Sequence, residues 1–490
     1  MGYTSYLLVS VQEREQRGLS MAKTKKKKKF QMPHIYVILF TFSALAAIAT
    51  YFVPAGEFKR VPGPDGRETV DPNSFTLIES DPVGIIDFLT VIPRGLIDAG
   101  EIVFFTFIVG GMFMVLRTTG IIEIIVERLA NKFAKRSILL IPILTTVFAV
   151  IATVIGTPEL SLVYIPVIMP LIIALGYDSI VAAGIALLGT VIGFTAGVLN
   201  PVNVGLSQKI VGLPTFSGMG LRIILFIVVL IVGVLFLMRY ARKAQKDPLK
   251  NSFVYEDDEE KRELYKHQDA IEVRAMSKRQ VYASIAALLF LIGLVYGVLN
   301  EGWFMVEMAG LFIFMGIVVG LISGLNATEI SEAFTKGFRE VLMGAIIMGL
   351  ARAVAVVLED GRIMDTIVNS LGSVVGELPS VLGAVGMFLA QLAINFIIPS
   401  GSGQALVTMP IMGPLADIIG VTRQTAVLAF QVGDGFAHIL FPTSGYFMAA
   451  LVIAGVPWQK WVRFYLPVFL VFSGIGIVTL IFAQLVQWTG

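Results

Sequence analysis

Apolar runs long enough to cross a lipid bilayer recur along almost the whole chain. Two of them, Ile35–Val53 and Val281–Val298, contain no Asp, Glu, Lys or Arg. A helix of about 18 or more apolar residues spans the roughly 30 Å of hydrocarbon in a bilayer. Hydrophobic residues make up 56% of the 490 positions, whereas ordinary soluble domains contain roughly 45–50%. The sequence therefore predicts an all-α membrane protein that crosses the bilayer many times.

Charged residues between the runs predict how the chain is oriented and divided. Lys23 and the stretch from Lys25 to Lys29 precede the first run, and positively charged flanks stay in the cytoplasm. We therefore expect a cytoplasmic N-terminus, an extracytoplasmic C-terminus and a location in the cell (inner) membrane. The predicted segments are a cytoplasmic arm at 1–33, a first transmembrane half at 34–240, a charged cytoplasmic linker at 241–278 and a second transmembrane half at 279–490.

Four apolar stretches are interrupted by Gly, Pro, Ser, Thr and Asn, and they come in two pairs. In the first half, GTPELSL (156–162) separates two short apolar arms, and GFTAGVLNPVN (193–203) breaks the next helix. In the second half, PSGSGQAL (399–406) and GDGFAHILFPTSG (433–445) do the same. Polar backbone at membrane depth is tolerated only where it is buried in protein or lines a wet cavity. We predict re-entrant hairpins at 137–176 and 380–420, each followed by a broken transmembrane helix, at 179–212 and 423–455.

The two halves align in order, which indicates an internal repeat. The aligned pairs include Gly95 and Gly337, Leu116 and Leu358, Pro166 and Pro410, Pro170 and Pro414, and Pro201 and Pro442. A shared apolar composition would not place prolines and break points in the same order. The first repeat is expected to begin outside and the second inside, which makes them inverted repeats. Amphipathic segments are expected at Gly84–Asp98, Ile121–Arg136 and Thr328–Glu340, the last of them separate from a span at Val341–Leu358.

Discontinuous helices of this kind are typical of secondary transporters. The N-termini of half-helices attract anionic groups, and unwound carbonyls bind cations. We therefore expect no cofactor but a coupling Na+ or H+, with a candidate cation site near Gly193, Asn200, Gly433 and Asp434. Acids predominate at the breaks, because Glu159 lies in the first tip and Asp434 lies between two glycines of the second break. A charge in mid-membrane is costly and usually functional.

The candidate substrate-binding residues lie at the hairpin tips and the helix breaks. They are Gly156, Thr157, Glu159, Ser161, Asn200, Asn203, Ser400, Gly401, Ser402, Gly403, Gln404, Asp434, His438, Thr443 and Ser444. Plainer alternatives exist for several of them. Glu159 could simply reach water, His438 could be a core histidine, and the two asparagines could cap the break. Arg352, in mid-span, either pairs with an acid or reaches the interface.

The paired motifs GTPELSL…GFTAGVLNPVN and PSGSGQAL…GDGFAHILFPTSGY, together with the central linker, resemble the YfcC family from about Lys29 to the C-terminus. That family is near the anaerobic C4-dicarboxylate carriers and the arginine/ornithine antiporters in the ion transporter superfamily. The resemblance implies a scaffold domain that forms a homodimer, a mobile domain that carries both hairpins, and an elevator-type motion. The tips read GTPE and SGSG rather than the Ser-Asn-Thr typical of divalent anion/sodium symporters.

The charges at the breaks favour an amino acid substrate, basic or zwitterionic, moved by antiport or cation-coupled symport. Its carboxylate would bind at the SGSG helix terminus and its ammonium group near the acids. The alternative is a C4-dicarboxylate or another organic anion, which would need more positive charge than Arg352 supplies. A channel and an intramembrane enzyme are the remaining classes, although the spans lack HExxH, DDxxD and GxSxG patterns. The expected partners are a small-molecule substrate and the lipid bilayer, with no nucleic acid.

Overall fold

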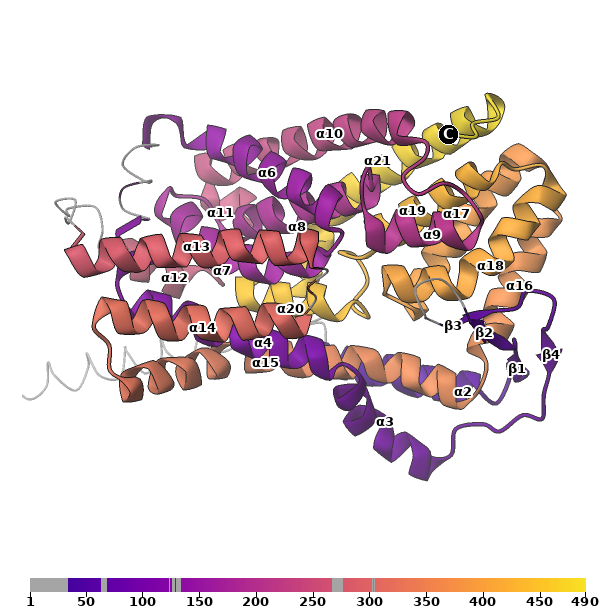
Figure 1. Ribbon diagram of the computed structural model, residues 1–490, viewed down its shortest axis with the longest axis horizontal. Coiled ribbons are helices and arrows are strands. Elements are labelled where there is room, and N and C mark those ends of the chain that lie inside the picture. Colours follow the sequence, from indigo (N-terminus) through magenta and orange to yellow (C-terminus); the bar gives the residue numbers. More distant parts are fainter. Residues whose placement is uncertain are drawn as a thin grey trace, which may run out of the picture.

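The computed structural model describes residues 34–62, 68–122, 124–125, 128, 134–266, 276–301, 303 and 305–490 (Figure 1). The predicted N-terminal arm lies outside these residues, and so does part of the predicted amphipathic helix at Ile121–Arg136. Within the described residues, eight helices are long and apolar enough to cross a membrane. The prediction of a helical, multi-pass membrane protein is confirmed.

The first helices follow the predicted apolar and amphipathic segments. Helix α2 covers Ile35–Ala49, within the first apolar run. Helix α3 covers Ile85–Asp98, which is the predicted amphipathic segment, and α4 follows directly at Gly100–Thr118. A 3-10 helix, η2, at Ala134–Leu139 leads toward the predicted first hairpin.

Four short strands between α2 and α3 are not predicted by the sequence. They form two antiparallel pairs, β1 (Gly56–Glu57) with β4 (Thr76–Leu77) and β2 (Arg60–Pro62) with β3 (Glu68–Val70). Asp365 holds this loop in place, because its carboxylate accepts hydrogen bonds from the backbone of Phe58 at 3.0 Å and the guanidinium of Arg60 at 3.1 Å. Strands of two or three residues are too short for an alternating apolar pattern to reveal them.

Two helix pairs surround the predicted polar tips. In the first half, α6 (Leu140–Ile155) and α7 (Ser161–Ala174) flank a 3-10 turn, η3, at Pro158–Leu160. In the second half, α17 (Ser380–Ile397) and α18 (Gly401–Ile419) flank a short tip. Both pairs lie where the sequence predicts a hairpin.

The helix that follows each pair is interrupted near the predicted break. Helix α8 (Ser179–Ala196) is followed by a π-helical turn, η4, at Pro201–Gly205 and by α9 (Leu206–Ile210). Helix α19 (Arg423–Ala437) gives way to turns before α20 begins at Gly445 and ends at Ala454. The two halves therefore have the same order of elements through the predicted repeat.

Five further helices complete the described part of the two halves. They are α10 (Met219–Lys246), α13 (Lys278–Asn300), α14 (Met305–Ser323), α16 (Met364–Gly376) and α21 (Trp458–Leu485). Helix α13 begins at a capping box, in which Ser277 and Gln280 each satisfy a backbone N–H of the other, the arrangement that stabilises a helix N-terminus.

The prediction of a separate amphipathic helix and span in the second half is wrong. A single helix, α15, runs from Ala327 to Asp360. No proline interrupts this stretch, so the amphipathic part and the apolar part continue one helical path. In the first half, by contrast, the chain breaks at Ala99 between α3 and α4, the position that the repeat aligns with Val341.

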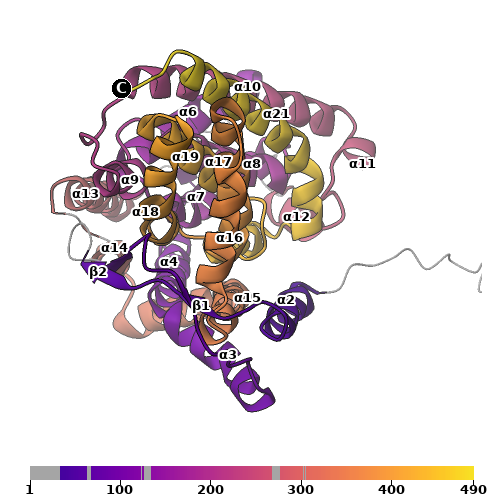
Figure 2. The same cartoon turned by 90° about the vertical axis from the view of Figure 1, so that its right-hand side faces the viewer.

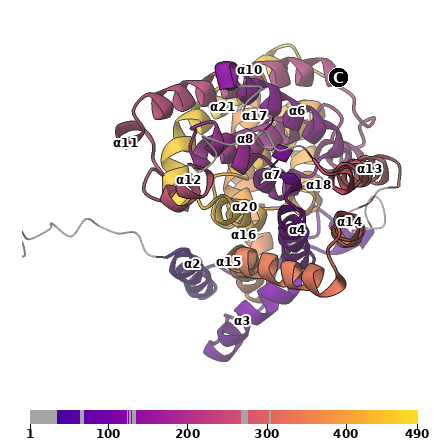
Figure 3. The ribbon, with the colours of Figure 1, turned by 90° about the vertical axis from the view of Figure 1, so that its left-hand side faces the viewer.

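The helices form two groups that lie side by side, as the end-on views in Figure 2 and Figure 3 show. One group contains α2, α3, α4, α14 and α15; the other contains both helix pairs, both broken helices, α10 and α21. Helices α4 and α15 cross with their backbones in contact, because an added Cβ on Gly337 would lie 2.3 Å from the carbonyl oxygen of Gly110. Small residues permit such close crossings in membrane proteins. Helix α15 also packs against α20, which joins the two groups.

The central charged segment folds back onto the helices. It contains α11 (Pro248–Asn251) and α12 (Glu259–Lys266). Figure 1 shows these two helices at one end of the long axis, and the strands and the C-terminus at the other. Residues 267–275 of the predicted linker lie outside the described residues.

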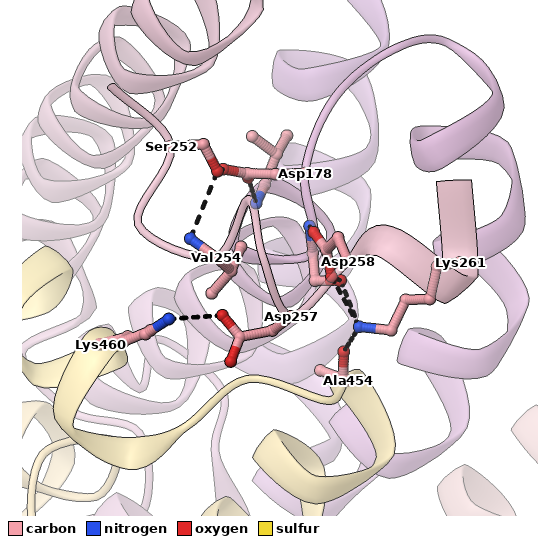
Figure 4. A network of polar contacts seen from close by, with 10 residues as sticks. Asp178, Ser252, Val254, Asp257, Asp258, Lys261, Ala454 and Lys460 are labelled. Carbon is pink, nitrogen blue, oxygen red and sulfur yellow. Dashed lines mark hydrogen bonds and ion pairs between the residues drawn. The ribbon is translucent and has the colours of Figure 1, made fainter. Parts of the chain in front are cut away.

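Hydrogen bonds and an ion pair of charged side chains connect the central segment to both broken helices (Figure 4). Asp258 accepts a hydrogen bond from the backbone of Ser179, at the start of α8, at 2.7 Å. The ammonium of Lys261 donates to Asp258 at 2.8 Å and to the carbonyl of Ala454, at the end of α20, at 2.8 Å. Asp178 accepts from the hydroxyl of Ser252 at 2.6 Å. We refer to Asp178, Ser179, Ser252, Asp258 and Lys261 as the linker network.

Candidate functional site

The first tip packs against the break in α8. Gly156 ends α6 with φ at +75°, and an added Cβ there would lie 2.2 Å from Oδ1 of Asn200. Glycine is therefore required by both the backbone conformation and the space. Oδ1 of Asn200 accepts from the backbone N–H of Asn203 at 3.0 Å, and its Nδ2 donates to the carbonyl of Phe194 at 3.3 Å. Asn200 thus stabilises the interrupted backbone, as the capping alternative expects.

Asp434 lies at the centre of a buried group of polar side chains. Its Oδ2 accepts from Nδ2 of Asn203 at 2.7 Å, and its Oδ1 accepts from Nδ2 of Asn395 at 2.8 Å. Nε2 of His438 lies 2.9 Å from the same Oδ1. Asp434 and both asparagines have no exposed surface, and His438 is 2% exposed. We call Asn203, Asn395, Asp434 and His438 the central polar cluster; it joins the break in α8 to α17 and α19.

The second tip brings a helix N-terminus to this cluster. Ser400 caps α18, since its hydroxyl accepts from the backbone N–H of Gly403 at 3.3 Å. An added Cβ on Gly401 would lie 3.3 Å from Oδ2 of Asp434, so the first turn of α18 is close to the carboxylate. The partial positive charge of a helix N-terminus stabilises a nearby anion. The SGSG tip therefore faces a protein carboxylate in this structure.

A ladder of amides connects α17 to α18 beside the cluster. Nδ2 of Asn395 also lies 3.1 Å from Oε1 of Gln404, whose Nε2 donates to Oε1 of Gln391 at 2.7 Å. Nε2 of Gln391 in turn donates to the hydroxyl of Thr408 at 3.0 Å. These hydrogen bonds hold the two arms of the second helix pair in register next to Asp434.

Many buried polar atoms around the cluster have no hydrogen-bond partner among the described residues. They are Oγ1 of Thr157, Thr195 and Thr443, Oγ of Ser444, the hydroxyl of Tyr446, Oδ1 of Asn203 and Asn395, and Nδ1 of His438. Most buried polar groups in proteins are paired, because an unpaired one costs the desolvation free energy of that group. Such a concentration is expected where a ligand, a water or a proton must be accommodated.

An open cavity of about 470 Å³ adjoins the cluster. Its walls come from both helix groups: the junction of α3 and α4, helix α15, both tips and the start of α20. The polar side chains that line it are Asp98, Glu101, Glu159, Arg352, Ser400, Thr443 and Tyr446. Glu159 is near enough to Asp434 and His438 to interact with them electrostatically. We therefore take the cavity and the central polar cluster together as the candidate site.

The charge of the cavity wall is mainly negative. Asp98, Glu101 and Glu159 supply three carboxylates, whereas Arg352 supplies one guanidinium. That guanidinium is already paired, since it lies 3.6 Å from Asp98 and 3.0 Å from Glu359. Arg352 thus follows the ion-pair alternative of the sequence analysis and contributes little net positive charge to the cavity.

Some predicted site residues have local contacts only. The hydroxyl of Ser161 donates to the carbonyl of Pro158 within the first tip, at 2.9 Å. Gly193 and Gly433 lie inside α8 and α19, where added Cβ atoms would be 2.0 Å from the carbonyl oxygen of Ala149 and 2.8 Å from that of Phe388. Both glycines therefore permit close helix crossings, and their backbone is helical rather than unwound. Ser402 is half-buried in the first turn of α18.

The described part of the chain contains no cluster of side chains typical of a metal site. No group of three or more His, Cys, Asp or Glu side chains is placed there so as to hold a metal ion. The predicted cation site near Asn200 and Asp434 therefore has one carboxylate, and any further ligands would be amide, hydroxyl or backbone oxygens.

Sequence reasoning missed several residues that complete the site. Gln391 and Asn395 are one helical turn apart in the apolar arm FLAQLAINF, so a polar stripe on an otherwise apolar helix was the available signal. No comparable sequence pattern marks Tyr446 or Asp98 as site residues. Asp98 ends an amphipathic helix and Tyr446 follows a break, and only the tertiary fold brings them to one cavity.

Comparison with known proteins places the chain among membrane transporters. The family model described as "C4-dicarboxylate anaerobic carrier" matches residues 32–485. A protein of Escherichia coli (strain K12) named "Putative basic amino acid antiporter YfcC" is 32% identical over 91% of this chain and 94% of its own length. An uncharacterised protein of Haemophilus influenzae is 28% identical over 94% of this chain and 98% of its own.

Two solved structures align along most of the chain. One is MtrF of Neisseria gonorrhoeae, described within a class of antimetabolite efflux pumps, with a TM-score of 0.41, 16% identity, and coverage of 94% and 96% of the two chains. The other is the YdaH transporter of Alcanivorax borkumensis, with a TM-score of 0.40, 14% identity, and coverage of 93% and 99%.

Proposed function

Because the chain belongs to the C4-dicarboxylate anaerobic carrier family of membrane transporters, we propose that it is a secondary transporter of the cell membrane whose substrate is a basic or zwitterionic amino acid. The observation that carries this proposal is the charge of the cavity, where Asp98, Glu101 and Glu159 face a single, already paired Arg352. The name of the Escherichia coli relative supports the same substrate class.

A C4-dicarboxylate is the second candidate, and the name of the family favours it. Two substrate carboxylates would face three protein carboxylates across the cavity, and like charges in a poorly solvated site repel strongly. Opening the contacts of Arg352 to Asp98 and Glu359 would free one guanidinium, which still leaves the wall negative. A substrate with at least one ammonium or guanidinium group complements this wall better.

Within this proposal, the substrate cation binds near Glu159, and the hydroxyls of Ser400, Thr443 and Tyr446 orient the rest of the molecule. Glu101 and Asp98 belong to the helix group that contains α4 and α15, whereas Glu159 belongs to the group that carries both helix pairs. The substrate therefore contacts both groups. Relative motion of the groups would carry the bound substrate from one side of the membrane to the other.

The contacts of α15 with α3 and α4 support inverted repeats, and an elevator-type motion is part of the same proposal. An added Cβ on Gly95 would lie 2.8 Å from the backbone N of Ala353, and one on Gly337 would lie 2.6 Å from Cα of Gly111. The alignment that pairs Gly95 with Gly337 also pairs Gly111 with Ala353. Gly95 of the first repeat thus contacts Ala353 of the second, and its counterpart Gly337 contacts the counterpart of Ala353, Gly111. Two repeats related by a two-fold axis would make such reciprocal contacts. In this proposal the group with α4 and α15 is the scaffold of a homodimer.

Substrate counterflow in proteoliposomes tests the proposal. Liposomes preloaded with unlabelled arginine, lysine, a neutral amino acid, succinate or fumarate are compared for uptake of the same labelled compound. We expect saturable counterflow with arginine or lysine. Counterflow with succinate alone would establish the dicarboxylate alternative, and non-saturable downhill flux would indicate a channel.

Cysteine labelling tests the orientation of the chain. The sequence contains no cysteine, so Lys59→Cys and Lys250→Cys each introduce one reactive thiol. Lys59 is an exposed residue beside the strands and Lys250 is an exposed residue of the central segment. An impermeant thiol reagent should label the first from outside the cell and the second from inside. Labelling of both from one side would contradict the inverted topology.

A further inference from the structure

His438 is buried with one of its ring nitrogens unused. Its Nε2 lies 2.9 Å from Oδ1 of Asp434, so the neutral ring can donate this hydrogen bond and leave a lone pair on Nδ1. Nδ1 has no partner among the described residues. A core histidine that served packing alone would normally have both nitrogens satisfied.

Hydroxyls in the same buried region can serve either protonation state of the His438 ring. The hydroxyls of Tyr446 and Thr443 are buried and likewise have no partner in the described part of the chain. The rings of His438 and Tyr446 are 5.9 Å apart, and Phe194 presents an apolar edge from α8 at 5.3 Å. A hydroxyl can donate to a neutral Nδ1 and, after rotation, accept from a protonated one.

The charged and titratable groups around His438 come from four elements. Asp434 lies on α19 itself, and Glu159 of η3 is near enough to act on the ring electrostatically. Tyr446 of α20 has its ring 5.9 Å from that of His438, and Tyr465 of α21 interacts with Tyr446. Two carboxylates therefore act on one imidazole, Asp434 by direct contact and Glu159 at longer range. They can hold one positive charge on the ring, and Glu159 is also part of the cavity wall where a cationic substrate would bind.

We infer that His438 carries the coupling proton, and that a proton on its Nδ1 and a cationic substrate group beside Glu159 exclude one another. This inference rests on the proposed function. Two positive charges in one poorly solvated site repel, whereas either alone is neutralised by the carboxylates. Two ligands that compete in this way are exchanged for each other by linkage.

The exchange is balanced in atoms and charge. When the substrate cation enters, the Nδ1–H bond breaks and the proton leaves through the hydroxyls of Tyr446 or Thr443 to water in the cavity. The ring becomes neutral and keeps its hydrogen bond to Asp434. When the cation leaves on the other side, a proton from water returns to Nδ1, so that one proton moves against one positive charge of the substrate.

Calorimetry of the purified protein measures the released proton directly. Arginine is titrated into the detergent-solubilised chain at about pH 6, near the ordinary pKa of histidine, in two buffers of different ionisation enthalpy. We expect release of close to one proton per arginine, and an affinity that weakens about tenfold per pH unit below this range. Binding of arginine without proton release would overturn the inference and leave the proposed function standing. Binding of succinate in place of arginine would overturn both.

Two variants assign the proton to His438. His438→Gln should bind arginine with no proton release and no pH dependence, while the exposed His34→Gln control should behave like the wild-type protein. Release that persists in His438→Gln would overturn the assignment. If that variant does not fold, the combined His34→Gln and His267→Gln variant leaves His438 as the single histidine of the chain. Its imidazole nitrogen resonances should change from the charged to the neutral form when arginine is added, and an unchanged signal would overturn the inference.

Discussion

Asp258 and Asp434 are both carboxylates with no exposed surface, yet their surroundings differ. In the linker network, Asp258 accepts from the backbone and the hydroxyl of Ser179 and pairs with Lys261. In the central polar cluster, Asp434 faces two amides and a neutralisable histidine. The first carboxylate has a permanent cation beside it, and the second does not.

The polar atoms around the two carboxylates differ in the same way. In the linker network each side-chain oxygen and the ammonium of Lys261 has a partner, and Lys261 also reaches the carbonyl of Ala454. Around Asp434, by contrast, amide oxygens, hydroxyls and Nδ1 of His438 have none among the described residues. Burial of a charge is common to both regions. The unpaired polar atoms mark the region that we expect to bind and release something.

The largest effect is expected from Asp258→Ala, on stability. Removing one partner of a buried ion pair leaves the other charge uncompensated, which typically costs about 3–5 kcal/mol. Lys261 is 24% exposed, so solvent offsets part of that cost and the lower end, about 3 kcal/mol, is expected. Denaturant titration of the detergent-solubilised protein measures this loss in the free energy of unfolding.

Arginine binding by the folded fraction of Asp258→Ala should stay within about twofold of the wild-type value, because the linker network does not line the cavity. The matched control is Asp247→Ala, which removes a surface pair with Lys250 whose side chains are 37% and 83% exposed. A loss of affinity in Asp258→Ala with unchanged stability would mean that the linker network, and not only the central polar cluster, serves binding.

Much of the fold follows from the sequence, because membrane spans are set by long local patterns. Apolar runs and paired break points predict α6, α7, α17 and α18 and the interruptions after α8 and α19. The continuity of α15 was missed, since an amphipathic stretch and an apolar stretch differ in composition but share one helical path. The docking of the central segment was also missed. The density of charged residues in this segment predicts a solvated linker. Only the tertiary fold buries Asp258 against Ser179.

The second largest effect is expected from Asp434→Asn, on transport. The amide keeps the shape but removes one of the two carboxylates that neutralise a positive charge in the site, a loss of about 1.5–3 kcal/mol, as for a hydrogen bond to a charged group. Affinity for the substrate should fall roughly ten- to over a hundred-fold. Binding is measured by calorimetry and transport by counterflow, with Asp417→Asn, an exposed carboxylate paired with Arg423, as the control. Wild-type affinity in Asp434→Asn would remove the central polar cluster from the site.

The site could be predicted only in part. Glu159, Asn203, Asp434 and His438 stand out as polar residues at helix breaks, and the structure brings them together. Their partner Asn395 lies in the middle of an arm, where a single amide is easily taken for a tolerated polar residue. The cavity wall from α3, α4 and α15 could not be assigned, because it depends on how the two helix groups pack and not on any local pattern.

A smaller loss of affinity is expected from Glu159→Gln. Glu159 is half-buried on the cavity wall, so water screens its attraction to a cation more than at Asp434. We expect affinity for arginine to fall about tenfold, which corresponds to about 1.4 kcal/mol, with little change in stability. Raising the ionic strength should reduce the difference between variant and wild type. A larger loss than in Asp434→Asn would place the substrate charge at the tip alone.

The smallest effect is expected from Asp257→Asn, next to Asp258 in the sequence but outside the linker network. Its carboxylate pairs with the ammonium of Lys460 at 2.5 Å, and the two side chains are 26% and 36% exposed. Partly exposed ion pairs contribute about 0–1 kcal/mol, because water competes for both charges and the side chains lose entropy when they pair. The free energy of unfolding should therefore change by less than about 1 kcal/mol, and counterflow should be unaffected. Denaturant titration beside Asp258→Ala measures the contrast between adjacent carboxylates, and equal losses in the two variants would mean that the central segment is held by its charge as a whole rather than by the buried pair.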